Sequence, residues 1–138
     1  MKRFISLCLT LAVSVGTFGI MSSAQKNTPD ISPYYTYAIE ASSNLDISSS
    51  KATCKSSATG GFSVTKISAT QYLQKKDGTK WETVDNATWS DSVNGISFSM
   101  TNSKSGLSSG TYRLKTVFRV YCGNSYEEFE KLSQEVII

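Results

Sequence analysis

Hydrophobic and polar residues alternate along most of the chain after residue 34, in short runs separated by Gly, Asn, Asp and Ser. The most regular run is TYRLKTVFRVYC, in which Tyr112 and every second residue up to Cys122 share one face. Such alternation is typical of a β-strand with one buried and one exposed face. No stretch after residue 34 has a long helical period. We therefore predict an all-β domain.

The same pattern predicts strands on both sides of this run. They are expected at 35–47 with a break near 42–44, at 51–58, in the two arms of a hairpin within 62–84, at 96–101 and at 131–138. Asp77-Gly78 and Asn94-Gly95 are turn signals, because glycine accepts the positive φ of tight hairpin turns. About seven strands at this spacing predict a two-sheet Greek-key sandwich.

Residues 1–24 have the organisation of a secretory signal peptide. Lys2 and Arg3 precede an apolar run, and small residues follow it up to Ala24. The alternative is a membrane anchor, but Ser, Thr and Gly interrupt the run, and a span needs about 20 strongly apolar residues. We expect cleavage, and a mature protein that is extracellular, associated with the cell wall or free, without a membrane span.

Cleavage leaves a flexible leader at 25–33 and one domain at 34–138. It removes Lys2 and Arg3, so 12 of the 14 basic residues remain against 11 acidic residues and the mature chain is nearly neutral. Nucleic-acid binding needs a clustered positive excess, so we predict no nucleic-acid partner. Histidine is absent. This excludes catalysis by a Ser-His or Cys-His pair and any histidine-ligated metal centre.

The predicted domain contains two cysteines, Cys54 and Cys122. Cys54 shares the inward face of an early strand with Ala52 and Ser56, whereas Cys122 ends the penultimate strand. In an exported protein an even number of cysteines predicts a disulfide. The alternative is two separately buried thiols. In a Greek-key sandwich these two strands belong to opposite sheets, so we expect one disulfide between the sheets.

The order of Cys54, a hairpin with Trp81, and Cys122 resembles an immunoglobulin-like domain. "SGTYRLKTVFRVY" is similar to the penultimate strand of a fibronectin type III domain, where a tyrosine follows a small loop. Tyr112 lies ten residues before Cys122 rather than two, so the resemblance implies an Ig-like relative of the true immunoglobulin domains. The chain also resembles small secreted proteins of Gram-positive bacteria that carry "YLQKKDGTKW"-like and "SGTYRLK"-like segments. That resemblance implies a bacterial source and brings no established activity.

Aromatic residues are the strongest candidates for binding. Rings on an exposed sheet bind sugars or protein partners, whereas the alternative role is cross-strand packing and core filling. The predicted binding residues are Trp81, Trp89, Tyr72 and Tyr121.

Charged residues offer weaker candidates. Basic residues near the Asp77-Gly78 turn and on the outward face of 111–122 fit an acidic cell-wall polymer, or serve only solubility. Glu127, Glu128 and Glu130 suggest a calcium site or a solvated loop, and the regular oxygen spacing of a calcium loop is missing.

The predicted function is a secreted, monomeric binding module that recognises a cell-surface glycan or protein through an exposed sheet face or end loops. Alternatives are a toxin-like or antagonist factor, a structural envelope protein, and a glycan-active enzyme. For the enzyme, the available carboxylates are Glu82 with Asp85 or Asp91. A small sandwich spends its interior on a core, so a deep pocket is not expected. We predict no catalytic residue, no metal ligand and no cofactor.

Overall fold

The computed structural model describes residues 35–138, which contain eight strands and no helix. The strands are β1 (Ala38–Ser48), β2 (Lys51–Gly60), β3 (Lys66–Asp77), β4 (Lys80–Val93), β5 (Ser97–Lys104), β6 (Thr111–Cys122), β7 (Ser125–Leu132) and β8 (Val136–Ile137). The all-β prediction is confirmed. The predicted signal peptide at 1–24 and leader at 25–33 lie outside the described residues.

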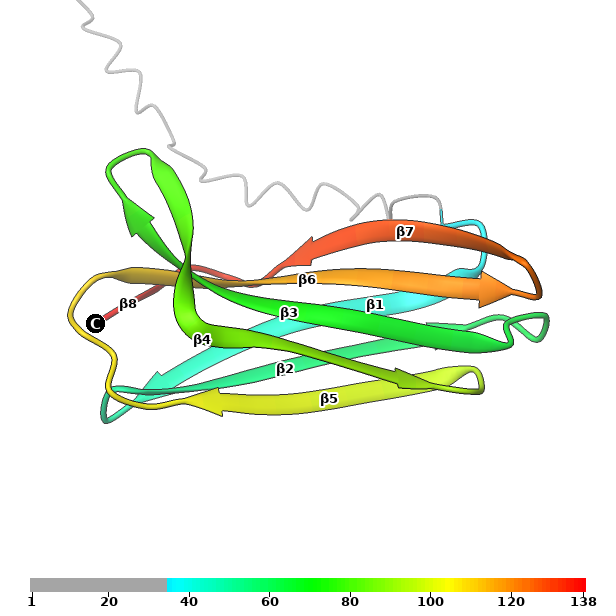
Figure 1. Ribbon diagram of the computed structural model, residues 1–138, viewed down its shortest axis with the longest axis horizontal. Helices are drawn as coiled ribbons and strands as arrows, with labels where there is room; N and C mark the ends of the chain where they lie inside the picture. Colours follow the sequence, from blue (N-terminus) through cyan, green and yellow to red (C-terminus); the bar gives the residue numbers. More distant parts are fainter. Residues whose placement is uncertain (1–34) are drawn as a thin grey trace, which may run out of the picture. The chain divides into compact units, whose positions relative to one another are not determined.

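The strands form two antiparallel sheets that are stacked on each other (Figure 1). The three-stranded sheet has the order β1-β2-β5, and the five-stranded sheet has the order β4-β3-β6-β7 with β8 beside β6. The hairpins β1-β2, β3-β4 and β6-β7 each stay within one sheet. The connections β2-β3, β4-β5 and β5-β6 cross between the sheets, so both sheets are built from early and late strands.

Two apolar clusters fill the space between the sheets. The first contains Ala38, Ala58, Val64, Ile67, Ala69, Phe98, Met100, Phe118 and Val120. The second contains Leu45, Ala52, Cys54, Leu73, Ala87, Leu107, Tyr112 and Leu114. The inward faces predicted for β2 and β6 are therefore correct, because alternation of period two places these side chains on one side of each strand.

A buried group of polar side chains also joins the two sheets. Ser43 of β1 and Ser56 of β2 lie in one sheet, and their hydroxyls are 2.9 Å and 2.7 Å from Thr116 Oγ1 on β6. Gln71 of β3 donates from Nε2 to Ser56 Oγ at 2.7 Å and accepts at Oε1 from Asn102 Nδ2 at 2.9 Å. Buried polar groups are tolerated when they are hydrogen-bonded to one another.

The predicted disulfide between Cys54 and Cys122 is not present, because both thiols are free. Gln71 Nε2 donates to the carbonyl of Cys54 at 3.3 Å, and Gln71 pairs in register with Thr116. The strand from Thr116 to Cys122 covers about 20 Å at ~3.3 Å per residue. A disulfide requires Cα atoms within about 7 Å. The prediction was wrong because a shared inward face does not place two residues at the same level along their strands.

The beginning of β1 also differs from the prediction. The sequence places Tyr35, Tyr37 and Ile39 on one face, whereas Ala38 is buried and Ile39 is 66% exposed. The pairing of β1 with β2 shifts register between Ala38 and Glu40. A bulge of this kind adds one residue on one strand, so Ala38 turns inward and Ile39 outward, while Tyr35 and Tyr37 still pack against the first apolar cluster.

The last part of the chain forms strands earlier than expected. The predicted strand at 131–138 is replaced by β7, which pairs with β6, and by the short β8. Gly123 has a φ of 62°, which suits the tight turn that connects β6 to β7. The glutamate-rich segment is therefore a paired strand and not a loop, with Phe129 packed against the core.

Candidate functional site

One surface of the molecule carries aromatic rings on four neighbouring strands. Trp81 lies on β4, Tyr72 on β3, Tyr121 on β6 and Tyr126 on β7, in the order of the five-stranded sheet. Leu73, beside Tyr72 in the chain, is fully buried, so alternation turns the rings away from the core. We call this surface, the side of the five-stranded sheet that points away from the three-stranded sheet, the outer face.

Each ring of the outer face lies beside a cationic side chain from another strand. The closest pair is on β4 and β6, where the guanidinium carbon of Arg113 is 4.2 Å from the ring centroid of Trp81. The other pairs are Lys115 with Tyr72 at 5.9 Å, Lys66 with Tyr121 at 5.4 Å, and Arg119 with Tyr126 at 5.3 Å. Cation-π attraction holds these long side chains over the rings.

Two of the cations on the outer face are paired with carboxylates of β7. Arg119 Nε donates to Glu128, and Lys115 Nζ lies 2.9 Å from Glu130 Oε2. The hydrogen bond that Arg119 donates to Glu128 raises the pKa of Arg119 above its ordinary value. The cations of Lys66, Lys76 and Arg113 have no carboxylate partner within residues 35–138. The outer face therefore carries an excess of positive charge.

The three glutamates of β7 do not form a shared site. Glu128 and Glu130 pair with the outer face, whereas Glu127 points to the opposite side. The carboxylate of Glu127 accepts hydrogen bonds from the backbone amides of Thr36, Tyr37 and Ala38 at 2.6 to 2.8 Å. Among the described residues no three acidic, cysteine or histidine side chains lie close enough together to hold a metal ion. The calcium interpretation therefore has no support in the geometry.

The predicted ring residues do not all share one surface. Trp81, Tyr72 and Tyr121 lie on the outer face, but Trp89 is partly buried and packs against both core clusters. Tyr126, which is 52% exposed on the same face, was missing from the prediction because its segment read as a loop. The alternation of Tyr126 and Glu128 with Glu127 and Phe129 was the signal that indicates a strand there.

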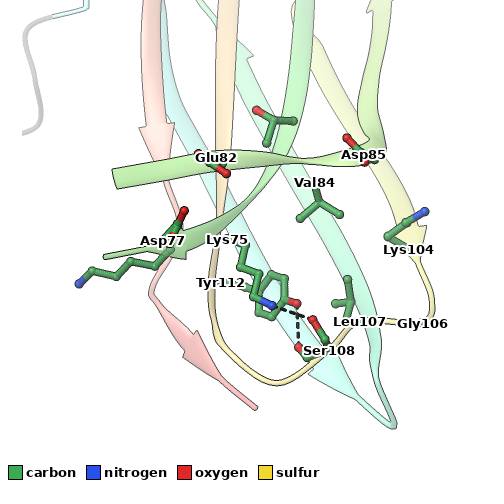
Figure 2. Close-up of a pocket in the computed structure, with 12 residues that line it drawn as sticks. Lys75, Asp77, Glu82, Val84, Asp85, Lys104, Gly106, Leu107, Ser108 and Tyr112 are labelled. Carbon is green, nitrogen blue, oxygen red and sulfur yellow. Dashed lines mark hydrogen bonds between the residues drawn. The ribbon is translucent and has the colours of Figure 1, made fainter. Parts of the chain in front are cut away.

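A second feature is a cleft of about 480 Å³ between the β3-β4 hairpin and the β5-β6 loop (Figure 2). The hairpin projects beyond the rest of its sheet (Figure 1). Its pairing shifts register between Tyr72 and Gln74, and Asn86 has a φ of 56° on the opposing strand. A bulge increases the local twist, and this turns the hairpin away from the sheet. The cleft lies on the side of the hairpin that faces residues 104–108.

A lysine held in place by two neighbours lies in this cleft. Lys75 Nζ donates to Ser108 Oγ at 2.6 Å and is 5.5 Å from the ring centroid of Tyr112. The hydroxyl of Tyr112 donates to the carbonyl of Ser108 at 2.7 Å. Figure 2 shows these two hydrogen bonds converging on Ser108. Half-buried Val84 and the buried side chain of Leu107 add an apolar surface beside them.

Charged groups of both signs surround the cleft. Asp77, Glu82 and Asp85 line it together with Lys75, Lys76 and Lys104. Glu82 and Asp85, the carboxylates that the sequence offers for an enzyme, therefore share one cavity, whereas Asp91 does not line it. Little in the sequence indicates this arrangement, because the cleft depends on the projecting β3-β4 hairpin and on the β5-β6 loop, which are separated in the chain by the rest of β4 and by β5.

Cys54 is the one described group whose pKa moves far from its usual range through burial. Burial disfavours the thiolate and raises the pKa of the Cys54 thiol from 9.0 to about 12. The thiolate is the form of cysteine that attacks substrates and binds metals. The buried thiol therefore has a packing role.

Comparisons of the chain with protein-family models, curated proteins and solved structures find no match. Within residues 35–138, no helix is long and apolar enough to cross a membrane. The outer face and the cleft are therefore the two features from which function is inferred.

Proposed function

We propose that this chain is a secreted, Ig-like binding module that recognises a cell-surface glycan through the outer face of its five-stranded sheet. The partner glycan carries anionic groups. The proposal rests on one observation, which is that the aromatic rings and the cations without carboxylate partners lie on the same surface. Residues 1–24 are proposed to export the protein.

Two observations support an Ig-like Greek-key sandwich. The hairpins β1-β2 and β3-β4 lie in different sheets, and the later strands β5 and β6 return to pair with β2 and β3. Tyr112 lies near the start of β6, and its hydroxyl donates to the carbonyl of Ser108, four residues before it. This is the hydrogen bond of a tyrosine corner, which is a feature of immunoglobulin-like domains.

The chemistry of the outer face favours a glycan with acidic groups. The C–H side of a sugar ring packs against aromatic rings, which have a large apolar surface and a polar end. Lys66 lacks a carboxylate partner within residues 35–138, and so does Arg113, whose Nε donates to Gln74 Oε1 at 2.8 Å. The ammonium of Lys66 and the other guanidinium nitrogens of Arg113 can bind carboxylate, phosphate or sulfate groups of the same polymer. The rings on four strands give this surface room for several sugar residues.

A protein partner is the second candidate, and the composition of the outer face also favours it. Tyrosine, tryptophan and arginine are enriched at the centres of protein interfaces. The same surface would then bind through ring burial, with the cations at the rim. The two candidate partners differ in the treatment of the envelope that destroys binding, which is periodate for a glycan and protease for a protein.

The test is retention of the exported protein on envelope preparations of the source cells. The double variant Trp81→Ala, Tyr121→Ala is compared with the control Ser99→Ala, Thr101→Ala, whose changes are exposed on the three-stranded sheet. We expect the first pair to lower retention at least tenfold and the control to bind like the wild type. Periodate treatment of the envelope should abolish retention, and protease treatment should not. Equal retention of all three proteins would contradict the proposal, and loss after protease alone would favour a protein partner.

A further inference from the structure

We propose that the cleft between the β3-β4 hairpin and the β5-β6 loop is a second binding site, which takes one neutral, hydroxyl-rich sugar residue. This inference deepens the proposed function, because it assigns a second glycan contact to the protein. It does not depend on the outer face, since the two sites share no ring and lie on different sides of the hairpin.

The charge balance of the cleft selects the class of ligand. Asp77, Glu82 and Asp85 line a cavity that also contains Lys75 and Lys104, whereas the Nζ of Lys76, whose residue also lines the cavity, lies over Trp81 on the outer face. An anionic ligand would meet the carboxylates and a cationic ligand would meet the lysines. A neutral ligand avoids both costs. This distinguishes the cleft from the outer face, where the positive charges are in excess.

The hydrogen-bonding groups of the cleft fit hydroxyls. A carboxylate only accepts hydrogen bonds and an ammonium only donates them, whereas a hydroxyl does both. A polyol can therefore donate to Glu82 and Asp85 and accept from Lys75 or Lys104. The side-chain carboxylates of Glu82 and Asp85 form no hydrogen bond or ion pair within residues 35–138, so both are free to accept.

The cleft also has an apolar part and a lysine that is already positioned. Val84 and Leu107 provide a surface for the C–H groups of a sugar ring. Lys75 is held by Ser108 and by the ring of Tyr112, so little side-chain freedom is lost on binding. Gly110 makes room for this lysine, because a Cβ at that position would lie 2.5 Å from Lys75 Cε. The cavity of about 480 Å³ lies within the ~300–1,000 Å³ range of small-ligand sites.

The experiment is an NMR titration of the labelled, exported protein with methyl glycosides. The probes are the neutral glucoside, galactoside and N-acetylglucosaminide, with methyl glucuronide as the anionic arm and methyl glucosaminide as the cationic arm. A single sugar residue is expected to bind with a Kd of about 1–10 mM. We expect at least one neutral probe to shift the amides of residues 82–85 and 104–108, and the charged probes to bind more weakly.

The matched variant is Glu82→Gln, Asp85→Asn, which keeps the shape of two exposed side chains and weakens their acceptors. It should raise the Kd at least fivefold. Gly110→Ala, which displaces Lys75, should do the same and serves as the independent variant. The outer-face control Glu128→Gln should bind like the wild type. Absence of shifts at the cleft with every neutral probe, or unchanged binding in both cleft variants, would overturn the inference.

The two proposals fail in different ways. The Trp81→Ala, Tyr121→Ala protein, which has lost the outer-face function, should still show sugar-induced shifts at the cleft. If the cleft binds no sugar, retention on the envelope should still be lowered by that same pair of substitutions. Shifts at the cleft without any envelope retention would therefore refute the outer-face proposal and support the cleft.

Discussion

The hydroxyl groups of Ser56 and Thr116 lie 2.7 Å apart in the interior, where this hydrogen bond joins the three-stranded sheet to the five-stranded sheet. Thr116 Oγ1 is also 2.9 Å from the hydroxyl of Ser43. All three residues are buried. Hydrogen bonds between these polar side chains therefore connect the two sheets, whereas the sequence predicted that a disulfide would do so.

Replacement of Thr116 by valine keeps the shape of the side chain and removes the shared hydroxyl. Ser43 and Ser56 each lose one hydrogen bond but keep another, since Ser43 Oγ still lies 3.4 Å from the carbonyl oxygen of Leu114 and Ser56 Oγ still accepts from Gln71 Nε2. A hydrogen bond contributes about 0.5–1.5 kcal/mol, so we expect the free energy of unfolding in urea to fall by about 1–3 kcal/mol. Thr101→Val, at an exposed position of β5, should change it by less than about 0.5 kcal/mol. Similar stability of the two variants would show that the buried hydroxyl is dispensable.

Glu127 fastens the segment before β1 to β7. Its carboxylate accepts from the amides of Thr36, Tyr37 and Ala38. In Glu127→Gln the charge is lost, and hydrogen bonds to charged groups contribute about 1.5–3 kcal/mol. Amide exchange at residues 36–38 should accelerate about tenfold or more, because a loss of about 1.4 kcal/mol corresponds to a factor of ten. Glu128→Gln, which leaves these amides bonded, is the control, and equal exchange in both variants would contradict the assignment.

The raised pKa of Cys54 makes stability depend on pH in the alkaline range. The folded state keeps the proton to a pKa of about 12 and the unfolded state loses it near 9.0. The unfolded state then binds fewer protons at alkaline pH. The contribution of the Cys54 thiol to stability is therefore fully present below pH 9 and is lost as the pH rises toward 12. The difference in unfolding free energy between wild type and Cys54→Ala should shrink by about 1–2 kcal/mol from pH 8 to 10.5. A constant difference would mean that the thiol is accessible to water.

The free thiols should differ in reactivity. Cys54 is fully buried and Cys122 is half-buried at the end of β6. Iodoacetamide at pH 8 should label Cys122 in the folded protein and Cys54 only after unfolding, because the exposed thiolate is the reactive form. Peptide mass spectrometry checks this. A Cys54–Cys122 linked peptide in the purified protein would contradict the positions of both residues.

Alternation along the chain predicted the fold class and the inward faces of β2 and β6 correctly. It worked because a period of two ties each side chain to one side of a sheet. It failed at Ile39, where a bulge reverses the faces, and at Cys54 and Cys122. The position of a residue along its strand, relative to neighbouring strands, is set by register and by turns. The alternation of hydrophobic and polar residues does not contain this information.

The candidate site was predictable only in part. Alternation placed Tyr72 and Tyr121 on outward faces, and both lie on the outer face, as does Trp81. A role of these rings in binding stays a prediction. The sequence pattern could not distinguish Trp89 from these outward rings, since the bulge at Asn86 decides which face of the sheet the second half of β4 presents. The cleft was not predicted, because it arises from a hairpin tip and a loop brought together by the crossing connection β5-β6.

The most direct test of the outer-face proposal is chemical-shift mapping with purified anionic envelope polysaccharide at low and high salt. We predict shifts on β3, β6 and β7 around Tyr72, Tyr121 and Tyr126, together with the indole of Trp81, and weakening as salt screens the cations. Shifts confined to the three-stranded sheet, or to the loop of the fully exposed Phe62, would contradict the proposal.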